Sequence, residues 1–161
     1  MSLIFKRRFV REKVLQYLYA YEMNRDNLNE LKSELLSVIR EENDMQFAED
    51  LINKVIIHRE EADKRIIDKV NNWEMNRIAL IDKLLLRIGI TELLYFTDIP
   101  PKVSINEVIE IAKLYSTSGS GKFINGILDS ILNDEKSAGR LNKTGRGLID
   151  ENISKPSGSE N

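Results

Sequence analysis

Apolar residues recur along most of the chain at spacings of three and four, which places them on one face of a helix. No segment shows the regular alternation of apolar and polar residues that is typical of a half-buried strand. The pattern predicts a first helix from Arg8 to Met23 and a second over residues 27–41. It also predicts helical structure over 45–73, as two helices or as one that breaks near 58–61. The chain is therefore predicted to be all-α.

The segment RIALIDKLLLRIGITELLYF (residues 77–96) is apolar on nearly all sides. Such a helix is typical of the centre of a bundle, where neighbouring helices cover every face. Asn76, directly before the segment, is a candidate N-cap. Pro100 and Pro101 are expected to stop this helix, because proline donates no backbone hydrogen bond.

Two further helices are predicted after the proline pair. Ser104 and Glu107 match the S-x-x-E capping box of a helix start, and Val103 and Val108 stand where a hydrophobic staple would close it. A last helix is predicted to begin near Ser120.

The apolar pattern fails after Asn133. The residues that follow are rich in glycine, serine, asparagine and charge, a composition that buries too little apolar surface to fold. The sequence therefore predicts one helical domain over residues 1–135, followed by a flexible, disordered tail over residues 136–161.

Composition excludes several classes of protein. No apolar run approaches the roughly 20 residues that a membrane-spanning helix needs. The N-terminal sequence MSLIFKRRFV has few apolar residues, and they precede the basic cluster, which is the wrong order for a secretory signal. The chain has no cysteine, so it has neither disulfides nor thiolate metal sites. We expect a cytoplasmic protein with no membrane partner.

Charge is distributed unevenly along the chain, although the formal net charge is only -2. A basic arm at the start of the first helix, opposed there only by Glu12, consists of Lys6, Arg7, Arg8, Arg11 and Lys13. Acidic residues dominate the region from Glu30 to Asp63. A basic arm on an acidic chain predicts a localised anion-binding surface rather than general affinity for polyanions. The alternative is that the arm is simply the solvated start of a helix.

Candidate catalytic chemistry is sparse. His58 is the only histidine, and no nucleophile motif accompanies it. Zinc sites need several histidine or cysteine ligands, and the carboxylates near His58 lack EF-hand spacing. We expect no catalytic residue, no metal and no cofactor, and we interpret His58 as a residue at a helix end.

The stretch STSGSGKFINGIL (residues 116–128) looks like a phosphate-binding loop but lacks the first glycine, the final hydroxyl and the preceding strand of a P-loop. A helix N-terminus nevertheless attracts anions, Lys122 adds positive charge, and Phe123 offers a ring. This combination suits single-stranded RNA, whose bases stack on aromatic side chains. The alternative is that Phe123 belongs to the core and the loop is an ordinary connection.

The first helix has two distinct sides on a helical projection. One side is an apolar core face. The other carries Leu15 and Tyr19, an i, i+4 apolar pair set among polar residues. An exposed apolar pair beside a basic arm predicts a protein-partner surface next to a nucleic-acid surface. The alternative is that another helix covers this side.

Three segments, RRFVREKVLQYLYAYE, LIDKLLLRIGITELLYFTDIPPKVSINEVIEIAKLYS and KFINGILDSIL, together closely resemble the NusB family of bacterial transcription antitermination factors. The similarity covers residues 7–132. The resemblance implies a compact bundle of about seven helices that binds boxA RNA together with the ribosomal protein NusE and catalyses no reaction. It also implies assembly with RNA polymerase and other Nus factors, which suppresses termination during ribosomal RNA synthesis.

The resemblance also implies roles for individual residues. RNA contacts are expected from Lys6, Arg7, Arg8, Arg11, Gln16, Lys122, Phe123 and Asn125. NusE contacts are expected from Tyr19 and Asp82, and the helical projection adds Leu15 to this partner surface. Family members commonly carry an acidic residue where this chain has Gly119, so one carboxylate expected to engage NusE is missing.

Two other interpretations are compatible with the sequence. The first is a helical scaffold that contacts only protein, through Leu15 and Tyr19, with an incidental basic arm. The second is a detached relative of the NusB-like domain of RNA cytosine methyltransferases, although this chain has no room for a catalytic domain.

Overall fold

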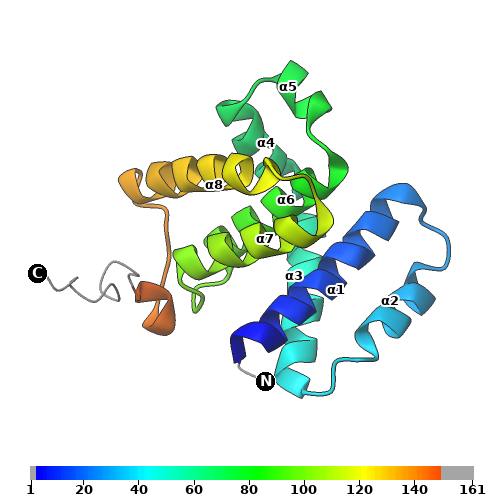
Figure 1. Cartoon of the computed structure of the whole chain (residues 1–161). Helices are drawn as coiled ribbons and strands as arrows, with labels where there is room; N and C mark the ends of the chain where they lie inside the picture. The colour runs from blue at the N-terminus through cyan, green and yellow to red at the C-terminus, as the bar shows by residue number, and fades with distance from the viewer. Residues whose placement is uncertain (1–2, 150–161) are drawn as a thin grey trace, which may run out of the picture.

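Eight α-helices make up most of residues 3–149, the range that the computed structural model describes, with side chains from Lys6 onward. They are α1 (Leu3–Met23), α2 (Leu28–Leu36), α3 (Glu42–Ile57), α4 (Arg59–Lys69), α5 (Asn72–Arg77), α6 (Leu80–Tyr95), α7 (Pro101–Tyr115) and α8 (Ser120–Ser137), followed by the 3₁₀-helix η1 (Gly145–Leu148) (Figure 1). This range contains no strand, which confirms the predicted all-α fold. The additional helix is α5, which at six residues is too short to show an apolar period.

The central helix is α6, as its apolar sequence predicts. It packs against α1, α3, α4, α7 and α8 (Figure 1). Leu84, Leu86 and their neighbours are fully buried, and burying one such side chain contributes about 1.5–3 kcal/mol. Four polar residues of α6 are buried too, so they need partners inside the protein: Asp82, Arg87, Thr91 and Glu92. Arg87, for example, donates two hydrogen bonds to the carboxylate of Asp63 in α4, at 2.7 and 3.0 Å.

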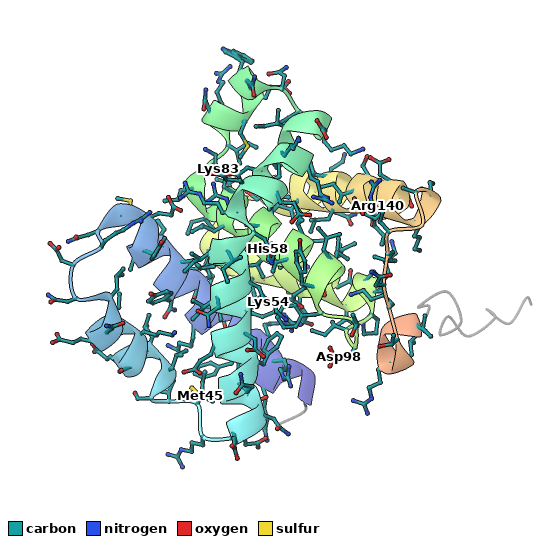
Figure 2. The ribbon with its side chains drawn as sticks, turned by 180° about the vertical axis from the view of Figure 1, so that it is seen from behind. Met45, Lys54, His58, Lys83, Asp98 and Arg140 are labelled. Carbon is teal, nitrogen blue, oxygen red and sulfur yellow. The ribbon has the colours of Figure 1, made fainter. Side chains whose placement is uncertain are left out.

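The predicted break near residues 58–61 is present, and it divides the region into two helices. α3 ends at Ile57 and α4 begins at Arg59, with His58 between them, which confirms the interpretation of His58 as a helix-end residue (Figure 2). The imidazole ring stacks on Tyr95 of α6, with ring centroids 3.9 Å apart. No helix in residues 3–149 combines the length and the apolarity needed to cross a membrane.

Two predicted helix ends are wrong. Asn76 lies inside α5 rather than before α6, and the extended residue before α6 is Ala79. The helix that Asn caps is α5, where the side chain of Asn71 accepts a hydrogen bond from the backbone N–H of Glu74 (2.8 Å). α2 stops at Leu36, earlier than the predicted end of the second helix.

The predicted capping box is also wrong. α7 begins at Pro101, because the fixed φ and missing N–H of proline suit the first position of a helix. Ser104 therefore lies within the helix, where its hydroxyl donates to Glu92 of α6 (2.9 Å). The carboxylate of Glu107 accepts hydrogen bonds from Arg8 of α1. Both side chains of the predicted capping box therefore bond to residues of other helices instead of capping α7.

The C-terminal region is more structured than the sequence predicts. The predicted domain end at residue 135 falls inside α8, which continues to Ser137. Residues 138–149 then return along the bundle to η1 (Figure 1). The rest of the predicted tail, residues 150–161, lies outside the described residues.

A buried lysine attaches this C-terminal segment to α6. The Nζ of Lys143 donates to the backbone carbonyls of Glu92 (3.1 Å) and Phe96 (2.7 Å), at the end of the helix. A cation is favourable there because it meets the negative end of the helix dipole. Burial nevertheless lowers the pKa of Lys143 to about 8.

The titration of Lys143 should be visible in the stability of the protein. Its pKa is lower in the folded chain than in the unfolded one, so between the two values the folded chain has already released the proton and stability rises with pH. Relative to Lys143→Met, the wild-type chain should gain about 1–2 kcal/mol of unfolding free energy from about pH 7.5 to about pH 9.5. Urea unfolding of both proteins measures this gain. If the difference in unfolding free energy between the two proteins did not change with pH, Lys143 would not be a cation buried on folding.

Candidate nucleic-acid interface

The first three cations of the basic arm lie at the surface of α1, each beside a carboxylate. Lys6 bonds to Glu41, Arg7 Nε to Asp44 Oδ1 (3.0 Å), and Arg8 to both oxygens of Glu107 (2.8 and 3.0 Å). The hydrogen bond between Lys6 and Glu41 raises the pKa of the lysine and lowers that of the carboxyl. All three cationic side chains remain partly exposed, so an anion can approach them at the rim of each pair.

Arg11 does not belong to this surface, contrary to the sequence-based expectation. Arg11 is only 2% exposed, and its guanidinium donates two hydrogen bonds to Glu92 of α6, at 2.8 and 2.6 Å. Glu92 is completely buried. The pair is therefore a structural element inside the bundle. The guanidinium is buried and hydrogen-bonded to Glu92, so it has no exposed surface that could contact RNA.

Two residues expected at the protein-partner surface are likewise interior. Leu15 is buried in the core. The carboxylate of Asp82, at the start of α6, is buried and accepts hydrogen bonds from the hydroxyls of Ser116 (2.7 Å) and Ser120 (2.8 Å). Asp82 therefore holds the turn between α7 and α8, which explains its position better than a direct partner contact does.

Tyr19 is exposed, at 40%, and borders an apolar groove of about 450 Å³ between α1 and α2. This α1–α2 groove is lined by Leu15, Gln16, Tyr19, Ala20, Leu31, Leu35, Ile81 and Tyr115. Gln16, expected on the RNA side, donates to the hydroxyl of Tyr115 (2.9 Å) at the edge of this groove. Tyr19 is exposed, as the helical projection predicts, whereas Leu15 lines the same groove from a buried position.

The motif at the start of α8 is exposed. Phe123 is 38% accessible, and Lys122 and Asn125 also face solvent. The side chain of Lys122 makes no hydrogen bond or ion pair with any residue in the described range. A Cβ at Gly119 would meet no atom within 4 Å, so the position that is commonly acidic in the family is open surface here.

Sequence reasoning missed a groove beside this motif. The α5–α8 groove has a volume of about 1060 Å³ and is lined by Trp73 and Arg77 on one side and by Lys122 and Phe123 on the other. Trp73 is 64% exposed, and the guanidinium of Arg77 lies 4.5 Å from the centre of its ring. The available signal was the segment NWEMNR, in which a tryptophan and an arginine four residues apart fall on one helix face.

The basic arm lies beside the middle of α7, and the α8 motif follows the end of α7. Arg8 meets Glu107 in the middle of α7, and Gln16 meets Tyr115 at its end, so α1 and α7 run alongside each other. The rise from Glu107 to Tyr115 is about 12 Å. The two halves of the expected RNA surface are therefore separated along α7 and do not meet at one point.

Comparison with known proteins identifies the family. The sequence profile of the NusB family matches residues 8–133. The chain belongs to the NusB family. Transcription antitermination protein NusB of Chloroherpeton thalassium is 47% identical over 150 residues, covering 92% of this chain and 71% of the relative. The protein of the same name from Salinibacter ruber is 49% identical over 145 residues, covering 89% and 91%.

Solved structures of NusB proteins share the fold. T. maritima NusB is 36% identical with a TM-score of 0.73, over 80% of this chain and 91% of that one. A NusB crystallised with NusE and double-stranded RNA is 24% identical with a TM-score of 0.71, over 80% and 97%. The NusB family consists of antitermination proteins rather than enzymes, as the sequence predicts.

The reassignment of Arg11 can be tested through stability. Arg11→Ala leaves the Glu92 carboxylate buried without its partner, which should lower the unfolding free energy by about 3–5 kcal/mol. Arg40→Ala, at an exposed arginine, is the control and should change it by no more than about 0.5 kcal/mol. Urea unfolding measures both. Normal stability of Arg11→Ala together with weaker RNA binding would return Arg11 to the RNA surface.

Proposed function

We propose that this protein is a cytoplasmic antitermination factor that binds single-stranded boxA RNA together with ribosomal protein NusE. In this role it joins RNA polymerase and other Nus factors during ribosomal RNA synthesis. The proposal rests on membership of the NusB family and on the names of its relatives, which are transcription antitermination proteins.

One observation about the site carries the RNA-binding part of the proposal. The α5–α8 groove combines two exposed aromatic rings, Phe123 and Trp73, with the cations Lys122 and Arg77. Unpaired bases stack on aromatic rings, and phosphates need nearby positive charge. Lys122 can supply that charge without giving up a described partner.

The NusE part of the proposal rests on the α1–α2 groove. Its lining is almost entirely apolar, and Tyr19 stands exposed at its edge. A tyrosine beside an apolar groove is typical of a protein-partner surface, because the ring buries a large area and the hydroxyl tolerates a wet rim.

A scaffold that contacts only protein is the second candidate. Arg7 and Arg8 are already paired with carboxylates, and this observation favours it. Anisotropy titrations with boxA-like and scrambled RNA separate the two functions. Preference for the boxA-like RNA supports the factor, and equal weak binding of both supports the scaffold.

Replacing the ring of Phe123 should weaken RNA binding. Phe123→Ala removes one stacking surface, which is worth about 1–3 kcal/mol per base. Lys122→Ala should lower the slope of log affinity against log salt by about one unit. Anisotropy over a range of salt concentrations measures both effects. Lys64→Ala, at an exposed lysine of α4, is the control, and equal behaviour of all three variants would contradict the α5–α8 groove as the RNA site.

Replacing Tyr19 should affect the protein partner alone. Tyr19→Ala shrinks the exposed edge of the α1–α2 groove and should lower NusE affinity by about tenfold, or 1.4 kcal/mol. RNA binding by the isolated protein should stay unchanged. Calorimetric titration with NusE and anisotropy with RNA report the two affinities separately. An equal loss of both would indicate a folding defect and would contradict a partner role for Tyr19.

A further inference from the structure

The described chain continues past α8 and beyond residues 8–133, the part that matches the family. Its course is fixed at two points on either side of Arg146. Before Arg146, Lys143 is held by the carbonyls at the end of α6, and the backbone N–H of Thr144 donates to the carbonyl of Thr97 (2.9 Å).

After Arg146, Gly147 lies directly against Thr97, in the loop between α6 and α7. A Cβ at Gly147 would stand 2.0 Å from the carbonyl oxygen of Thr97, so any larger residue would push the segment away. This close approach, together with the buried Lys143, sets the position of η1 on the bundle.

The attachment brings Arg146 to the first turns of α1. Arg146 and Arg7 line one groove of about 360 Å³, whose apolar wall includes Pro100, Val103 and Ile149. In Figure 2, Asp98 lies between the N-terminal end of α1 and η1, in agreement with its place in the lining of this groove. We call it the η1 groove.

Most charges around the η1 groove are neutralised within the protein. Arg7 is paired with Asp44, Arg11 with Glu92, and Glu107 with Arg8. Asp98 faces the positive charge of Lys143. The side chain of Arg146 is exposed and makes no hydrogen bond or ion pair within residues 3–149. It is the guanidinium at this groove that can bind an anion without breaking a described pair.

We propose that Arg146 is an RNA-phosphate contact, and that the η1 groove extends the RNA surface from the basic arm onto the C-terminal segment. The backbone of a single-stranded RNA passes between Arg146 and Arg7, and the apolar wall accommodates the sugar or base. This inference rests on the proposed function, since it extends the same RNA surface. It assigns a binding role to a segment for which the sequence predicts only a flexible tail.

The test uses the full chain and a single-stranded boxA RNA with flanking nucleotides on both sides, titrated by anisotropy at several salt concentrations. Arg146→Ala should weaken binding roughly fivefold and lower the salt slope by about one unit. Arg146→Lys should keep the slope. Gly147→Val retains every charge but displaces η1, so it should weaken binding by a similar factor.

Two controls separate this inference from the proposed function. Lys136→Ala removes the same charge from the exposed last turn of α8 and should have little effect. Phe123→Ala reports on the α5–α8 groove. If Phe123→Ala weakens binding while Arg146→Ala matches Lys136→Ala, the role of Arg146 is overturned and the proposed function stands. If the unmodified chain does not prefer boxA RNA, both proposals fall.

Discussion

The ion pair between Arg11 and Glu92 is the interaction on which the arrangement of the helices depends. It joins α1 to the central helix by two hydrogen bonds, and Ser104 of α7 donates to the same carboxylate. The backbone carbonyl of Glu92 also accepts from Lys143 of the C-terminal segment. Four segments therefore meet at one residue. Because an unpaired charge at this depth would be very costly, the pair permits only one register of α1 against α6.

The order of the helices follows from the sequence, but the tertiary partners of polar residues do not. Apolar periodicity predicted the central helix and the break at His58, because both depend on neighbouring residues. The capping box at Ser104 and Glu107 is an equally clear local sequence motif, yet it does not cap the helix. Glu107 instead meets Arg8, 99 residues away in sequence. No short-range pattern contains that information.

The same limit explains which exposed residues of the candidate sites were predicted. A projection of one helix shows which side chains share a face, and it correctly grouped Leu15 with Tyr19. It does not show how deeply that face is covered, so Leu15 is buried while Tyr19 is exposed. Arg11 was grouped with the arm by its charge and by the resemblance to the NusB family, although its side chain is buried. Trp73 was missed because α5 has too few residues to display a period.

The paired cations of the arm bear on how RNA would be held. A phosphate that approaches Arg8 competes with Glu107 for the same N–H groups, so the exchange gains less than contact with an unpaired cation would. The carboxylates would still favour binding, because they hold the arginine side chains in fixed positions before RNA binds. In the proposed function, RNA affinity would depend most on the two cations without such described partners, Lys122 and Arg146. Such a division would allow a protein of net charge -2 to bind RNA along one path and to repel polyanions elsewhere.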